Sequence, residues 1–282
     1  MKAIKRFCLL CVLLCQGLFS HAKTNSEFAI ADSLLLARRY DDAAMEFERV
    51  FFLSGTESTK DSALIAKARC LKLSGDYKNE QRTLLRLEVS HLADSVRYQV
   101  YYERALACYL ADDFENAANE FIQMNYFVKD TLLIRKSLFL QILVLNELHR
   151  WEDGKFLYRT FLEEHQLTYD SLPAYSFLET KTFKSASKAR LLSMVFPGAG
   201  QAYAGNFWKG ISGNLLFDAS AYYTIKSILD TYYISALLTG GIFIFRFYSG
   251  GIYYSENLVK QYNDKRSHEI NEAIKKIILA VQ

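Results

Sequence analysis

Few of the residue types that perform chemistry in proteins are arranged for it in this sequence of 282 residues. The five histidines show no metal-ligand spacing, and none forms a recognisable pattern with a serine or cysteine nucleophile. They are His21, His91, His149, His165 and His268. Three acidic pairs each fall at the start of a predicted helix, where carboxylates favour the helix dipole. They are Asp41-Asp42, Asp112-Asp113 and Glu152-Asp153. We therefore expect no cofactor and no metal, and we keep an enzyme only as a third alternative.

Two cysteines and two charged residues remain to be considered, the cysteines for a disulfide and the charged residues for an ion pair. Cys70 and Cys108 fall on neighbouring predicted helices, one position out of register. Helix axes about 8–10 Å apart do not suit a disulfide, whose Cα atoms lie within about 7 Å, so we expect free buried thiols. Asp218 and Arg246 lie in apolar stretches, where charges usually face protein or water. Within a helical hairpin these two would be candidates for an ion pair.

The elements that position these residues are indicated by a repeat in the first half of the chain. Four aromatic residues, Tyr40, Tyr77, Phe114 and Trp151, follow one another at intervals of 37 residues. Apolar or small residues recur around each aromatic at offsets of three and four, which is the spacing of one helix face. Each repeat therefore predicts two helices that meet at the aromatic. No such pair can bury its own apolar face, so successive pairs must stack.

The stretches YDDAA and FENAA resemble the tetratricopeptide repeat family. The resemblance covers roughly residues 26–165, although the period here is longer by about three residues. Glu80 and Gly154 depart from it, because they replace the expected alanine. The resemblance implies a solenoid whose first helices line a groove for a protein or peptide partner, with an ordinary solvated face as the alternative. The candidate groove residues are Arg69, Lys72, Tyr102, Tyr109, Phe139 and Asn146.

The start of the chain predicts export. Lys2, Lys5 and Arg6 precede an apolar run, and Ser20-His21-Ala22 offers small residues to a signal peptidase. A lipoprotein signal with Cys15 lipidated and an uncleaved anchor are alternatives. The net charge of +3 and the lack of a basic cluster do not favour a nucleic-acid partner.

Composition changes near residue 190. Residues 191–255 hold five charged residues but nine of the thirteen glycines. Two apolar stretches, 207–229 and 231–255, are long enough to cross a hydrocarbon core of about 30 Å and predict an antiparallel membrane hairpin. The basic stretch 181–190 would then lie outside the cytoplasm, against the positive-inside tendency. A soluble glycine-rich cap packed on the repeats is the alternative.

The stretches PGAGQAYAGNFWKG and FYSGGIYYSENLVKQYN resemble a group of bacterial envelope proteins with a Pro-Gly-x-Gly-Gln-x-Tyr-x-Gly motif. The resemblance covers about residues 188–263. It implies a membrane location and no particular activity. The motif positions are Pro197, Gly198, Gly200, Gln201, Tyr203, Gly205 and Gly210.

The residues of this motif predict a broken helix at the membrane surface. Pro197 cannot donate a backbone hydrogen bond, the glycines permit tight turns, and Gln201 can bond to freed backbone groups. A phosphate-binding loop is a weaker interpretation, since no strand pattern precedes the motif and no Gly-Lys-Ser/Thr ending follows.

Together these patterns predict an all-α protein. It comprises a signal peptide (1–22), a four-unit repeat domain (23–170), a basic linker (171–190), a membrane hairpin (191–255) and an amphipathic tail helix (256–282). We expect an envelope scaffold that contacts membrane lipid and binds a protein partner. Two alternatives remain open: an accessory protein for transport or membrane insertion in which the hairpin is active, and a soluble periplasmic repeat protein with a packed cap.

Overall fold

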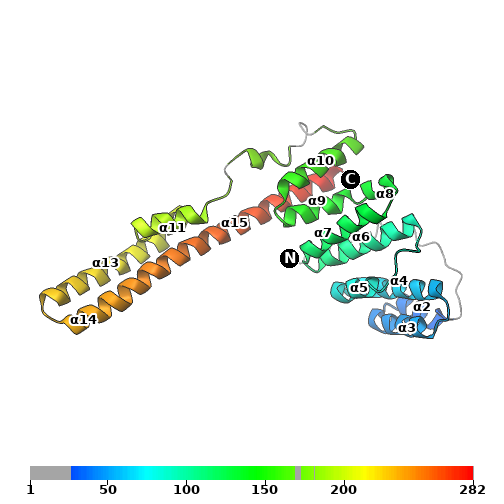
Figure 1. The fold of residues 1–282 in the computed structure, drawn as a ribbon, viewed down its shortest axis with the longest axis horizontal. Helices are drawn as coiled ribbons and strands as arrows, with labels where there is room; N and C mark the ends of the chain where they lie inside the picture. Colours follow the sequence, from blue (N-terminus) through cyan, green and yellow to red (C-terminus); the bar gives the residue numbers. More distant parts are fainter. Residues whose placement is uncertain (1–26, 169–172, 181, 282) are drawn as a thin grey trace. The chain divides into compact units, whose positions relative to one another are not determined.

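The structure is a computed structural model that describes residues 27–168, 173–180 and 182–281 (Figure 1). Within these residues all regular secondary structure is helical, as the sequence predicts. The expected signal peptide, with Cys15, lies outside the described residues. The chain divides into two compact units, of which the first ends at Val144 and the second begins at Leu145. The sequence placed its boundary later, near residue 170.

The first unit consists of consecutive helices that pack on their chain neighbours, such as α3 on α4 and α6 on α7. Alanine, leucine and valine fill its core, and Phe47 and Tyr101 are its largest buried aromatic residues. Its helices are α2 (Ala29–Leu36), α3 (Tyr40–Leu53), α4 (Glu57–Ser74), α5 (Tyr77–Leu84), α6 (Asp94–Leu110), α7 (Phe114–Phe127), α8 (Thr131–Arg135) and the first part of α9 (Leu138–Glu147).

The repeated aromatic residues each mark the start of a helix. The helices α3, α5, α7 and α10 (Trp151–Glu164) each begin at the repeated aromatic residue. Two residues earlier the chain always has a positive φ, at Arg38, Gly75, Asp112 and His149. The next N–H then donates to a carbonyl five residues back, as from Asp113 to Cys108 at 2.9 Å. The period of the sequence is therefore also the period of a helix-to-helix turn.

The fourth position of each second helix faces the interior. Its occupants are Ala43, Glu80, Ala117 and Gly154, and all four are buried. A small residue here lets the second helix approach the first closely. Glu80 is the exception, since it brings a carboxyl group into a place where the other units have alanine or glycine.

The second unit begins within α9 and continues through α10 to a hairpin of long helices (Figure 1). In the hairpin, α13 runs alongside α14, η4 and the start of α15, which follow one another without a break. Its other elements are η3 (Ser176–Glu179), α11 (Ala186–Val195), α12 (Ala199–Tyr203), α13 (Phe207–Leu229), α14 (Tyr233–Leu237), the π-helical η4 (Leu238–Ile244) and α15 (Phe245–Val281).

The turn of the repeats occurs twice more in this unit, which the sequence analysis missed. Gly205 and Thr231 have positive φ values of 101° and 61°. Each is followed two residues later by an aromatic residue that starts a helix, and five residues later by a buried glycine or alanine. The signal was present in GNFWKG and TYYISA, but these stretches do not follow the 37-residue spacing.

The expected tail helix is not a separate element, because α15 extends from the hairpin to Val281. Its last turns bury Ile270, Ile274 and Ile278. The Asn271 side chain bonds to the end of α9, and it also accepts a hydrogen bond from the Trp151 indole at 3.1 Å. This packing joins α10 to the glycine-rich half, which explains why the compact units divide earlier than composition suggested.

Candidate functional site

The glycine motif folds into a double corner between α11 and α13. Helix α11 ends at Val195, and Gly198 takes a φ of 91° before the short helix α12 begins. The broken helix predicted at Pro197 is confirmed. A Cβ atom on Gly198 would lie 2.2 Å from the carbonyl oxygen of Gly210, so the two glycines allow two backbone segments to touch. Gly200 is equally constrained, since its Cβ would lie 2.2 Å from Ser193 Oγ.

The glycine motif (197–210) and the later stretch 247–263 bond to each other across this corner. Gln201 Nε2 donates to the Gly251 carbonyl oxygen at 3.0 Å, and its Oε1 accepts from Ser193 Oγ of α11 at 3.4 Å, so this side chain links α11 to α15. The Asn263 side chain accepts from the Lys184 N–H at 3.0 Å and donates to the Lys184 carbonyl at 2.8 Å. Tyr203 Oη accepts from the Ser185 N–H. These motif residues therefore hold α11, α12 and α15 together.

Lysine and tyrosine side chains contact each other at the base of the hairpin, where α13 begins. The Lys184 ammonium lies 3.9 Å from the ring centre of Tyr262, and Lys188 lies 6.0 Å from that of Tyr203. Lys209 Nζ donates to Tyr254 Oη at 2.7 Å. Lysine and tyrosine at the end of an apolar helix are typical of a membrane–water interface.

The hairpin exposes large apolar side chains both beside Lys209 and near its tip. Trp208 is 80% exposed and Ile234 is 79% exposed. By length and composition, one helical stretch among the described residues could cross a membrane, Tyr233–Val281, and its most apolar window is only 6% buried. Helix α13 has the bounds expected of a second crossing but is less apolar, because it carries Asn214, Asp218 and Lys226.

The charges within the hairpin do not meet. Asp218 on α13 and Arg246 on α15 are both exposed, and no ion pair joins them among the described residues. The ion pair inside the hairpin considered from the sequence is therefore not formed in this structure.

The six candidate groove residues differ in their surroundings. Arg69 is exposed, whereas Lys72 forms a largely buried ion pair with Glu103. Tyr102 and Tyr109 are half-buried against the rings of Tyr98 and Phe114, and Phe139 is half-buried as well.

Asn146 requires a correction, because it is not part of a groove surface. It is 1% exposed, and its Oδ1 accepts a hydrogen bond from Tyr175 Oη at 2.9 Å. Its backbone carbonyl accepts from Asn271 of α15. A Cβ atom on Gly154 would lie 2.8 Å from Asn146 Oδ1, so glycine in place of alanine leaves room for the hydrogen bond between Asn146 and Tyr175. The sequence could not show that residues far along the chain cover this position.

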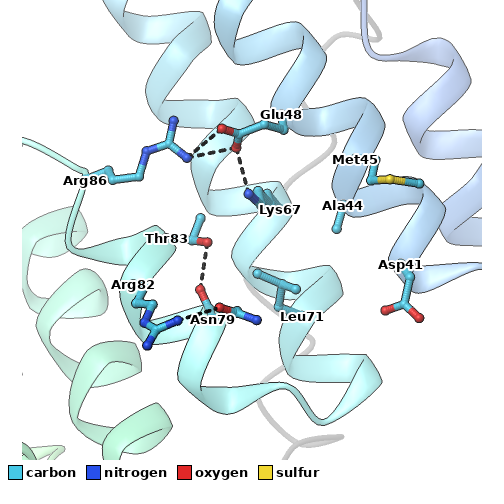
Figure 2. Close-up of a pocket in the computed structure, with 10 residues that line it drawn as sticks. All are labelled: Asp41, Ala44, Met45, Glu48, Lys67, Leu71, Asn79, Arg82, Thr83 and Arg86. Carbon is cyan, nitrogen blue, oxygen red and sulfur yellow. Dashed lines mark hydrogen bonds and ion pairs between the residues drawn. The ribbon is translucent and has the colours of Figure 1, made fainter.

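A cleft in the first unit was missed by the sequence analysis (Figure 2). It has a volume of about 380 Å³ and lies against α3, α4 and α5. Ala44, Met45 and Leu71 form its apolar part, and Met45 is 65% exposed. Its remaining lining residues are Asp41, Glu48, Lys67, Asn79, Arg82, Thr83 and Arg86.

The charged rim of this cleft is partly neutralised. Glu48 accepts from Lys67 at 2.8 Å and from Arg86 at 2.8 and 2.9 Å (Figure 2). These two cations hold the pKa of the Glu48 carboxyl below its ordinary value, against the opposing effect of its partial burial. Among the described residues Arg82 makes a single long hydrogen bond, of 3.4 Å to Asn79, and forms no ion pair.

Two buried carboxyl groups lie in the first unit. Burial raises the pKa of Glu80 to about 8, and it also raises the pKa of Glu120. One oxygen of each has no hydrogen-bond partner, although Arg104 approaches Glu120 to 3.9 Å. Cys70 and Cys108 are free and buried, as predicted, and burial raises their thiol pKa values to about 11 and about 12.

The acidic pairs serve local structure. Asp41 and Asp42 lie in the first turn of α3, and Arg150 pairs with Asp153 at 2.7 Å. Asp112 differs from the expectation, because it occupies the positive-φ turn before the helix and Asp113 caps α7 instead. No group of three metal-ligating side chains occurs in the part of the chain that the structure describes.

Comparison with known protein families, curated proteins and solved structures finds no match to this chain.

Proposed function

We propose that this protein is a membrane-attached scaffold of a bacterial envelope, whose helical repeats bind a protein partner. The proposed membrane attachment rests mainly on one observation. The hairpin displays apolar side chains such as Trp208, Leu237 and Phe245 to its surroundings, with exposed fractions of 71–80%. Monomeric soluble proteins rarely expose such continuous apolar surface. This exposure favours a lipid environment for the hairpin.

The length of the hairpin fits a bilayer. Helix α13 has 23 residues, which at about 1.5 Å per residue gives a length of roughly 35 Å. That length can cross a hydrocarbon core of about 30 Å. The lysine–tyrosine contacts of Lys184 and Lys209 would lie at one membrane–water interface. Lys226 and Asp230, near the tip, would reach the other.

The proposed binding of a protein partner rests on the repeated helix pairs and on the cleft of Figure 2. An apolar side chain of a partner would fill the cleft beside Met45 and Leu71. An acidic group of the same partner would pair with Arg82. The tetratricopeptide resemblance agrees with a peptide or protein ligand, although this cleft borders α3 and α5, which are second helices rather than first ones.

The alternative of a transport or insertion accessory is favoured by a different observation, the two exposed charges Asp218 and Arg246. An accessory protein would lose activity when either is replaced by an apolar residue. A scaffold with an inert anchor would keep its partner after such a replacement.

The proposed membrane attachment can be tested with tryptophan fluorescence. The chain contains two tryptophans, so a Trp151→Phe variant leaves only Trp208. Full-length protein in liposomes that contain spin-labelled lipids should show strong quenching of Trp208 by labels near the interface, and membranes from expressing cells should retain the protein after an alkaline carbonate wash. Weak quenching together with release by carbonate would contradict the proposal. The converse variant, Trp208→Phe, is the control. The Trp151 indole bonds to Asn271, which lies about 12 Å farther along α15 than Asn263, the partner of Lys184, so Trp151 should be quenched less.

A further inference from the structure

Asp218 and Arg246 are charges that the hairpin itself leaves without a partner. Both are exposed on apolar helices, and neither forms a hydrogen bond or an ion pair with the described residues. An isolated charge in hydrocarbon is costly, and charges in membrane segments usually pair with one another or face water. If the hairpin lies in a membrane, as proposed above, each of these side chains requires a group of opposite charge.

The rotation of the helices excludes a pairing within one hairpin. The rings of Phe217 and Tyr248 are 6.3 Å apart and mark the sides on which α13 and α15 face each other. Each residue turns an α-helix by about 100°. Asp218 therefore points roughly 100° away from the facing side of α13. Arg246 precedes Tyr248 by two residues and points roughly 200° away, on the outer side of α15.

The two charges nevertheless lie at nearly equal depth. Asp218 precedes the turn residue Thr231 by 13 residues, and Arg246 follows it by 15. At about 1.5 Å per residue, 13 residues correspond to about 20 Å from the tip, and the seven π-helical residues of η4, which rise less per residue, bring Arg246 to a similar distance. The difference is smaller than the reach of an arginine side chain.

We propose that the partner is a second copy of this chain, joined through a two-fold contact within the membrane. In such a contact α13 of each hairpin packs beside α15 of the other, so that Asp218 of one copy pairs with Arg246 of the second and the reverse pair also forms. One acid and one base at equal depth make the surface self-complementary. A different membrane protein would have to supply both opposite charges at that depth.

The surroundings of both charges allow a close approach. Gly250 follows Arg246 by one helical turn, and apart from its chain neighbours and its own helix backbone nothing lies within 4 Å of where its Cβ would be. Asn214 precedes Asp218 by one turn and is exposed, so it offers further hydrogen bonds. Small and polar residues of this kind are enriched where membrane helices pack.

Charge reversal tests this contact in the full-length protein. Donor- and acceptor-labelled copies are mixed in liposomes, and energy transfer is measured as lipid is added to dilute the protein. Wild-type protein should show transfer, and Asp218→Arg or Arg246→Asp should weaken association roughly tenfold. The double variant should restore it. Lys226→Gln and Asp230→Asn change exposed charges near the tip and should leave association unchanged.

Each outcome distinguishes this proposal from the membrane anchor on which it rests. Variants that remain in carbonate-washed membranes but lose energy transfer, with rescue in the double variant, support the two-fold contact. Wild-type protein that is membrane-bound yet shows no transfer overturns the contact and leaves the anchor standing. Transfer that is insensitive to all reversals also overturns it. Wild-type protein released by carbonate overturns both proposals.

Discussion

At the scale of single residues, Glu80 shows how one substitution changes a repeated position. The other three units place alanine or glycine there, and Glu80 is 1% exposed with one carboxyl oxygen unpartnered. Burial is the main cause of its pKa of about 8, with Lys72 opposing this rise and Glu103 adding to it. The carboxyl is therefore neutral in the folded protein at acidic pH, whereas in the unfolded chain it ionises near its ordinary value.

This shift predicts a decline of stability with rising pH. The folded form binds the proton more tightly, so the contribution of neutral Glu80 is fully present below pH of about 4.5 and is lost as pH rises through about 8. The slope reaches at most about 1.4 kcal/mol per pH unit. A Glu80→Gln variant should flatten this decline, measured as free energy of unfolding by urea and circular dichroism from pH 5 to pH 8.

The control is Glu115→Gln, which changes an exposed carboxylate in the first turn of α7. It should leave the slope as it is in the wild type. Glu120 also has a raised pKa and should contribute in the same direction, so some slope should persist in Glu80→Gln. Parallel curves for wild type and Glu80→Gln would show that Glu80 does not cause the decline.

At the scale of elements, α15 combines two roles in one helix. Its first part is exposed and apolar, and its last part buries isoleucines and bonds through Asn271 to Trp151 and to the end of α9. Because α15 is one continuous helix, the placement of its last turns also fixes the direction of its first part. The docking of its last turns therefore connects the hairpin with α10.

The Asn271→Leu variant should loosen this docking. It removes a bond to the Trp151 indole and one to the Asn146 carbonyl, and leaves buried polar groups unpaired at a cost of about 1–3 kcal/mol. Trypsin should then cut at Lys275 and Lys276 several times faster than in the wild type. Asn257→Leu on an exposed face of α15 is the matched control, and equal cutting of both variants would argue against a docking role for Asn271.

At the scale of the whole molecule, the proposal assigns partner binding and membrane attachment to different parts of the chain. The cleft belongs to the first unit, and the exposed hairpin belongs to the second. A scaffold of this kind should lose one property without losing the other.

This separation can be measured with a photo-crosslinking amino acid at Met45 in cells. Arg82→Glu reverses the charge at the cleft and should reduce the crosslinked partner about tenfold or more, as expected when an interfacial ion pair becomes a repulsion. Membrane retention should not change. Lys78→Glu on the same helix lies outside the cleft and should crosslink like the wild type. Loss of crosslinking in both variants, or in neither, would contradict a role of the cleft.

Features that depend on neighbouring residues could be predicted from the sequence. The helix starts at Tyr40, Tyr77, Phe114 and Trp151 and the break at Pro197 follow from local backbone preferences, which the chain carries wherever it packs. The all-helical class and the buried free thiols also follow from helical spacing.

Contacts between residues far apart in the chain could not be predicted and are seen only in the folded structure. Asn146 was a groove candidate, but Tyr175 and Asn271 approach it from 29 and 125 residues away and bury it. Asp218 and Arg246 share a depth in the hairpin, yet the rotation of their helices keeps them apart. The cleft at Arg82 exists because α3 and α5 both pack on α4. Helical periodicity fixes which face of one helix is apolar, whereas the rotation and distance between two helices depend on how their side chains pack.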